Sequence, residues 1–130
     1  MGAALRRYLE PVKADEGDVL MRQAEQSSDL MFIESGRVSV QLEMPDGRSV
    51  RVRVFGPGTV VGEIAFYLGV PRSASVIADR PTVAYRLTDE ALRRMAREEP
   101  ALIAEFHQYI ARLLAERLSE ANKLLRAVLH

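Results

Sequence analysis

The sequence predicts a mainly β fold: an eight-stranded β-roll, a double-stranded jelly-roll barrel, with flanking helices, two of them at its C-terminal end. Residues 10 to 87 form short β-rich runs at a spacing of roughly 8–12 residues, which is typical of sandwiches and barrels. Turn residues separate these runs at positions 16–18, 35–36, 45–47 and 56–58. From Thr88 onward the apolar residues instead recur with the 3.6-residue period of a helix.

The elements are expected in the following order. Residues 1 to 9 should form a short amphipathic helix, because Leu5, Tyr8 and Leu9 share one helical face. The strands are expected near residue 12 and at residues 19–21, 30–33, 38–42, 50–54, 60–61, 76–77 and 83–87.

Arg48, Arg51 and Arg53 interleave with the valines of the fifth run. This pattern fits either a basic binding strip or the solvated outer face of an antiparallel sheet. The solvated face is the favoured interpretation, because such sheets usually have one wet side.

Two helices should follow the β-roll. Thr88 is a good N-cap with acidic residues in the first turn, which predicts a helix to about Arg97. Pro100 should open a longer helix that ends near Leu129. Arg117 interrupts the heptad pattern of this helix, so no sustained coiled coil is expected. Its apolar stripe is still wide enough for a further partner, such as a second copy in a homodimer.

The composition narrows the function classes. With 130 residues and 48% hydrophobic content, the chain should form one domain, 1–130. Eighteen basic and eighteen acidic residues cancel, which gives no electrostatic reason to bind nucleic acid or an anionic membrane. There is no cysteine, no long uncharged apolar window and no signal-peptide core. A soluble cytoplasmic domain, or the cytoplasmic domain of a membrane protein, is therefore expected, with no membrane insertion by this chain.

Glu63 and Arg72 lie nine residues apart with a short apolar turn between them. A carboxylate accepts hydrogen bonds and a guanidinium donates them. Together they could hold a ligand with hydroxyls at one end and an anion at the other, such as a sugar phosphate. The planar fork of Arg72 suits a phosphate, and backbone N–H groups at the start of the turn would add donors.

This segment resembles the phosphate-binding cassette of cyclic nucleotide-binding domains, the family of catabolite-activator-like regulators, cyclic-nucleotide-regulated kinases and gated channels. The chain departs from the pattern at Val61 and Phe66, where the family usually has Phe and Leu; both changes are apolar. A β-roll followed by two helices is also the family's order, so the resemblance covers nearly the whole chain. The matching residues are Gly62, Glu63, Ile64, Ala65, Pro71, Arg72, Ser73, Ala74, Ser75 and Val76.

The resemblance implies roles for the residues of the cassette, 62–76. Glu63 would accept from the ribose 2′-hydroxyl, and Arg72 would pair with the cyclic phosphate. The backbone N–H groups of Ala65 and Ser73 would complete the phosphate cradle, with Gly62 allowing close approach. The Ser73 hydroxyl could reach a guanine amine or simply fit the turn, so it does not separate cAMP from cGMP. The implied ligand-binding set is Gly62, Glu63, Ile64, Ala65, Arg72, Ser73 and Ala74.

In this family a residue of the last helix covers the purine. The candidates here are Leu113, Leu114 and Arg117. Arg117 could stack on the base, or it could lie at the edge of the apolar stripe with its head in water.

Other kinds of site find no support in the sequence. The glycines of 56–62 have the wrong spacing for a dinucleotide loop. The two histidines, His107 and His130, have no second ligand nearby, so no metal is expected. Ser73 and Ser75 have no partner base, so hydrolysis is not expected.

The sequence therefore predicts a regulatory module, not an enzyme, that needs no cofactor. It should sense cAMP or cGMP and pass the signal through its C-terminal helix to other domains of a parent protein. One alternative is a degenerate fold that acts as an interaction or assembly domain. Another is the sensor part of a transcription regulator truncated before its DNA-binding part. The segments 33–38 and 55–58 are also compatible with a C-terminal domain of a sulfate-permease-type anion transporter.

Overall fold

The computed structural model describes residues 1 to 129. Contacts between residues divide the chain into two compact units. One unit comprises Tyr8–Leu92, and the other joins Met1–Arg7 to the residues from Arg93 onward.

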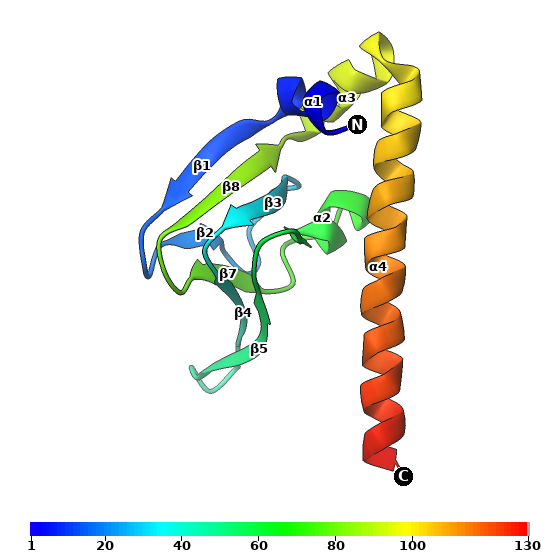
Figure 1. Ribbon diagram of the computed structural model, residues 1–130. Helices are drawn as coiled ribbons and strands as arrows, with labels where there is room; N and C mark the ends of the chain where they lie inside the picture. The colour runs from blue at the N-terminus through cyan, green and yellow to red at the C-terminus, as the bar shows by residue number, and fades with distance from the viewer. Residues whose placement is uncertain (130) are drawn as a thin grey trace. The chain divides into compact units, whose positions relative to one another are not determined.

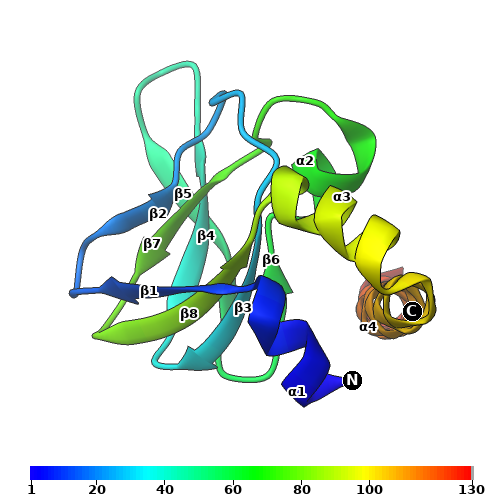
Figure 2. The ribbon, with the colours of Figure 1, turned by 90° about the horizontal axis from the view of Figure 1, so that it is seen from above.

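Two antiparallel sheets of four strands each form the Tyr8–Leu92 unit (Figures 1 and 2). A short helix, α2 (Glu63–Leu68), lies in the connection between the sixth and seventh strands. The eight β-rich runs of the sequence are the eight strands, which confirms the predicted fold class. The first sheet has the order β1 (Glu10–Ala14), β8 (Thr82–Leu87), β3 (Leu30–Ser35), β6 (Val60–Val61). The second has the order β2 (Val19–Met21), β7 (Ser75–Ala78), β4 (Val38–Glu43), β5 (Ser49–Phe55).

Apolar side chains from both sheets meet in one core. Strand residues alternate between faces, so the inward residues of each strand can pack against those of the other sheet. Met21, Val61 and Val76 belong to this core and also line the cavity described below, so the core forms part of the wall of that cavity. The buried members are Met21, Met31, Ile33, Val38, Val61, Val76 and Ala84.

A bulge at Val52 separates two arginines that were expected on one wet face. Val40 pairs with Arg53, but the next residue, Gln41, pairs with Arg51, so Val52 has no partner across the ladder. Directly opposed residues share a face, and one extra residue reverses the alternation. Arg51 and Arg53 therefore point to opposite faces of β5, and the prediction of one shared face is wrong.

Each of these arginines has a specific neighbour. The Arg51 guanidinium lies 3.4 Å from the Asp79 carboxylate, which is almost fully buried and also accepts from Ser39 and Arg37. The Arg53 guanidinium lies 5.0 Å from the centre of the Phe55 ring. The polar network around Asp79 ties β4 to the turn that follows β7.

The N-terminal helix is shorter than expected. Residues Gly2–Leu5 form α1, and Arg6–Tyr8 form a single 3₁₀ turn. Strand β1 begins at Glu10, and the extended backbone that precedes Pro11 is incompatible with a helix continuing to residue 9.

The two C-terminal helices begin where the sequence indicates. Helix α3 spans Asp89–Glu98, and the Thr88 hydroxyl accepts from the Ala91 N–H at 3.1 Å, as expected of an N-cap. Helix α4 spans Pro100–Leu129. Its buried residues are Leu102, Phe106 and Ile110, whereas its apolar residues from Leu118 onward are largely exposed. No helix within residues 1–129 combines the length and hydropathy that a membrane span requires.

Candidate functional site

The cassette is a turn of helix bounded by two glycines. Gly62 has φ +87° at the start of α2, and Gly69 has φ +68° at its end. Both values lie in the left-handed region that favours glycine. Pro71 follows shortly after, where a helix cannot continue, and the chain then returns into β7 through Arg72.

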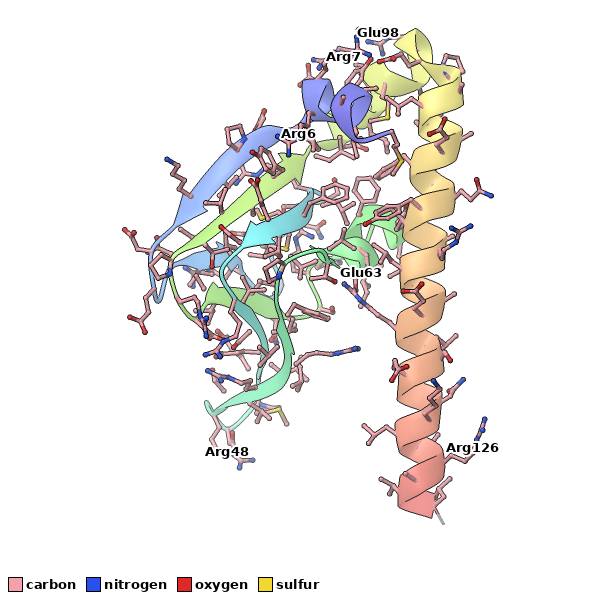
Figure 3. The ribbon with its side chains drawn as sticks, in the orientation of Figure 1. Arg6, Arg7, Arg48, Glu63, Glu98 and Arg126 are labelled. Atoms are coloured by element: carbon pink, nitrogen blue, oxygen red, sulfur yellow. The ribbon has the colours of Figure 1, made fainter. Side chains whose placement is uncertain are left out.

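A small cavity of about 70 Å³ lies against this turn. Figure 3 shows Glu63 at the first residue of α2. All seven residues of the ligand-binding set expected from the sequence line this cavity. The remaining wall is apolar and consists of Met21, Val40, Phe55, Val61 and Val76. The structure therefore brings together residues from both ends of the cassette and from strands of both sheets.

Arg72 is almost completely buried, with 4% of its surface exposed. Its Nε and Nη2 groups donate to the Ser27 hydroxyl at 3.1 and 2.8 Å. Nη2 also donates to the Asp29 carbonyl at 2.8 Å, and Nη1 donates to the Gly62 carbonyl at 3.2 Å. The guanidinium thus links the cassette to the loop that precedes β3.

Burial lowers the pKa of the Arg72 guanidinium, and the carboxylates of Asp29, Glu25 and Glu63 oppose this shift. The ordinary pKa of arginine is so high that the group keeps its charge at neutral pH. A buried, permanent positive charge with nearby protein acceptors is suited to exchange those acceptors for an anion.

The loop of residues 22–29 is also tied to Arg72 through the backbone. The Ala24 N–H donates to the Arg72 carbonyl at 2.8 Å, and the Arg72 N–H donates to the Glu25 carbonyl at 2.9 Å. The Gln23 N–H adds a bond of 2.9 Å to the Ser75 hydroxyl. Sequence reasoning missed this loop; its only signal is the polar Ser27–Asp29 run directly before a buried strand.

Gly62 allows a close approach of three groups. A Cβ atom at this position would lie 2.6 Å from Met21 Cε, 2.7 Å from Arg72 Nη1 and 2.8 Å from the Asp29 carbonyl oxygen. A side chain here would therefore displace Arg72 or the backbone that holds it.

The three residues expected to cover a purine lie on α4, in the other unit. Leu113, Leu114 and Arg117 are each partly buried. Their role stays a prediction.

Arg53 was expected on the solvated side of the sheet. It lies instead on the same side of the sheet as Val40 and Phe55, which line the cavity.

A larger pocket of about 390 Å³ lies between β1, β2 and β8. Its cations are Lys13, Arg22 and Arg86, but Arg86 lies 3.5 Å from Asp29 and 3.8 Å from Glu10, and Asp18 also lines the pocket. These carboxylates balance the positive charge, so this pocket has no net preference for an anion. Residues 1–129 contain no cluster of side chains that could hold a metal ion.

Comparison with known proteins identifies the family. The family model of the cyclic nucleotide-binding domain matches residues 11–99. The acetyltransferase Pat of Mycolicibacterium smegmatis is 40% identical over 81 residues, which are 62% of this chain and 24% of that protein. A CRP-like cAMP-activated global transcriptional regulator of Mycobacterium tuberculosis is 30% identical over 123 residues, which are 95% of this chain and 53% of the regulator.

Solved structures have the same fold. A cyclic nucleotide-binding domain from Methylobacillus flagellatus has a TM-score of 0.86 at 26% identity, covering 95% of this chain and 70% of that one. The catabolite activator protein of Thermus thermophilus has a TM-score of 0.78 at 27% identity, covering 98% and 58%. The chain spans about a quarter of the acetyltransferase and about half of the transcriptional regulator. By the match of residues 11–99 and by these relatives, the chain belongs to the cyclic nucleotide-binding domain family and is a regulatory domain of that family.

Proposed function

We propose that this domain binds cAMP in the cavity between the cassette, which includes α2, and the strands. The observation that carries the proposal is that Glu63 and Arg72, an acceptor and a charged donor, line the same cavity. We favour cAMP over cGMP because several relatives are named for cAMP. These are the M. tuberculosis regulator, a cAMP-dependent protein kinase regulatory subunit of Yarrowia lipolytica and a cAMP-binding acyltransferase of M. smegmatis.

In this proposal Arg72 pairs with the cyclic phosphate and Glu63 accepts from the ribose 2′-hydroxyl. The backbone N–H groups of Ala65 and Ser73 add donors to the phosphate, while Ile64 and Ala74 form part of the wall. The cavity of about 70 Å³ is smaller than the roughly 300 Å³ or more of ordinary ligand sites. The cavity as it stands can therefore enclose only part of a nucleotide.

Isothermal titration calorimetry of the domain with cAMP tests the proposal. The control ligand is 5′-AMP, whose phosphate does not form a ring. We expect a dissociation constant in the micromolar range, about −8 kcal/mol, and much weaker binding of 5′-AMP. A flat titration with cAMP on folded protein would refute the proposal and would support the alternative of a degenerate interaction domain.

The ribose contact can be tested by Glu63→Gln. Glutamine keeps an acceptor oxygen but loses the charge, so cAMP affinity should fall by roughly 1–2 kcal/mol. The loss should largely vanish with 2′-deoxy-cAMP. Glu16→Gln, in the exposed turn before β2, is the control for the change in net charge. If Glu63→Gln and wild type discriminate the deoxy analogue equally, Glu63 is not the ribose partner.

We further propose that α4 transmits the signal, with Leu113, Leu114 or Arg117 covering the purine. Nucleotide should then slow amide hydrogen exchange between about Phe106 and Leu118 as well as in residues 62–76. Protection confined to residues 62–76 would show that the nucleotide binds without changing the hydrogen exchange of α4. Hydrogen exchange measured by mass spectrometry with and without cAMP distinguishes the two outcomes.

The distal part of α4 is where we place the homodimer contact expected from the sequence. Leu118, Leu125 and Val128 on this part are 57–75% exposed, and so much apolar surface along one helix is suited to a partner.

The relatives named above include proteins of different activity, among them an acetyltransferase and a transcriptional regulator. A parent protein of the transporter type stays a prediction from the sequence.

A further inference from the structure

We propose that Ser27 is a positioning residue that holds Arg72 in its nucleotide-free geometry and competes with the phosphate for it. Nothing in the cassette pattern points to Ser27, which lies in the loop of residues 22–29. The inference rests on the proposed function, because it concerns how the phosphate reaches Arg72.

The donors of Arg72 are nearly all occupied. A guanidinium carries five N–H donors. Ser27 accepts from Nε and Nη2, the Asp29 carbonyl accepts from Nη2, and the Gly62 carbonyl accepts from Nη1. Within residues 1–129, these contacts leave one N–H, on Nη1, for an incoming anion.

A phosphate binds a guanidinium best through two parallel hydrogen bonds along one edge. The Nε–Nη2 edge of Arg72 is occupied by a single oxygen, the Ser27 hydroxyl. The Asp29 carbonyl accepts from Nη2 and the Gly62 carbonyl accepts from Nη1. A two-bonded phosphate must therefore displace either the Ser27 hydroxyl or at least one backbone carbonyl.

The hydroxyl is the easier group to displace. The Asp29 carbonyl directly precedes Leu30, a fully buried residue at the start of β3, and the Gly62 carbonyl also accepts the Phe66 N–H of α2 at 3.1 Å. Moving either carbonyl would disturb a strand or a helix. The Ser27 hydroxyl turns about a single bond, so it can leave Arg72 without moving a strand or a helix.

Ser27→Ala should therefore bind cAMP about 3- to 10-fold more tightly than wild type. It removes a competing acceptor and leaves two N–H groups of Arg72 unsatisfied only in the nucleotide-free state. Ser27→Asp should bind at least about 10-fold more weakly, because a carboxylate pairs with Arg72 more strongly and repels the phosphate.

Ser28 provides the matched control. Ser27 and Ser28 are both half-buried and line the same pocket of about 210 Å³, but the part of the chain that the structure describes shows no hydrogen bond from the Ser28 hydroxyl. Ser28→Ala and Ser28→Asp should change cAMP affinity by less than the corresponding Ser27 variants. In an Arg72→Ala background, Ser27→Ala should no longer tighten binding. Unchanged or weaker cAMP binding by Ser27→Ala would show that Ser27 does not compete with the phosphate for Arg72.

A readout without nucleotide separates this inference from the proposed function. In the free protein the Arg72 Nε–H resonance should exchange with water more slowly in wild type than in Ser27→Ala, measured by ¹⁵N NMR. If cAMP fails to bind but this difference is seen, the proposed function is wrong and the Ser27 contact is real. Equal exchange in both proteins would show that Ser27 does not hold Arg72.

Discussion

Arg72→Ala is expected to weaken cAMP binding by about 2–4 kcal/mol, a loss of roughly 30- to 1,000-fold. The variant removes the only cation among the residues that line the cavity, and the phosphate would then enter without its charged donor. Titration calorimetry measures the loss directly. Arg72→Lys keeps the charge but not the two-bonded fork, so its affinity should lie between those of Arg72→Ala and wild type.

The same variant tests the structural role of Arg72. Its removal leaves the Asp29 carbonyl without the Arg72 donor and leaves the Gly62 carbonyl with the Phe66 N–H alone, which should lower the free energy of unfolding by about 1–3 kcal/mol. Chemical denaturation measures this term, and binding is compared only where each protein is folded. Arg48→Ala, at the exposed tip of the β4–β5 hairpin (Figure 3), is the control for the charge. Equal cAMP affinity of wild type and Arg72→Ala would exclude Arg72 as the phosphate partner.

Gly62→Ala is expected to destabilise the Tyr8–Leu92 unit by about 2–5 kcal/mol. Adopting a left-handed backbone costs a side-chain-bearing residue about 1–2 kcal/mol. The contacts of the added Cβ with Met21, Arg72 and the Asp29 carbonyl add an overpacking term of about 1–3 kcal/mol. Met21 Cε is flexible, but the carbonyl oxygen belongs to the backbone and cannot move cheaply.

Gly69→Ala isolates the backbone term. Gly69 also has a positive φ, but a Cβ atom there would meet nothing within 4 Å. Its expected cost is therefore only about 1–2 kcal/mol. Denaturant titration of both variants gives the difference, which measures the close approach of Gly62 to Arg72. Equal destabilisation by the two substitutions would show that this approach is not energetically significant.

The sequence predicted the strands well because most of them are short apolar runs next to turn residues. The starts of α3 and α4 were equally readable, since Thr88 and Pro100 act locally. The residues around the cavity were found through the cassette pattern, in which 15 consecutive positions carry nearly all of the signal. These features share one property: their cause lies within a few residues of their effect.

The features that the sequence did not predict arise from distant contacts. Ser27 and Arg72 are 45 residues apart, and no local pattern joins them. The bulge at Val52 depends on the register between β4 and β5, so simple alternation placed Arg51 and Arg53 on one face. The burial of Arg72 likewise depends on the loop of residues 22–29 folding over it.

The bulge at Val52 also bears on whether the sheets can grow by adding strands from other molecules. Unpaired edges are templates for such addition unless they are short, kinked, charged or interrupted by proline. The sheet orders leave four edge strands, and each has such a feature. β6 and β2 are two and three residues long, β1 contains Pro11, and β5, the longest, is bent at Val52 between two arginines. We therefore expect the bulge at Val52 to limit edge-to-edge aggregation through β5.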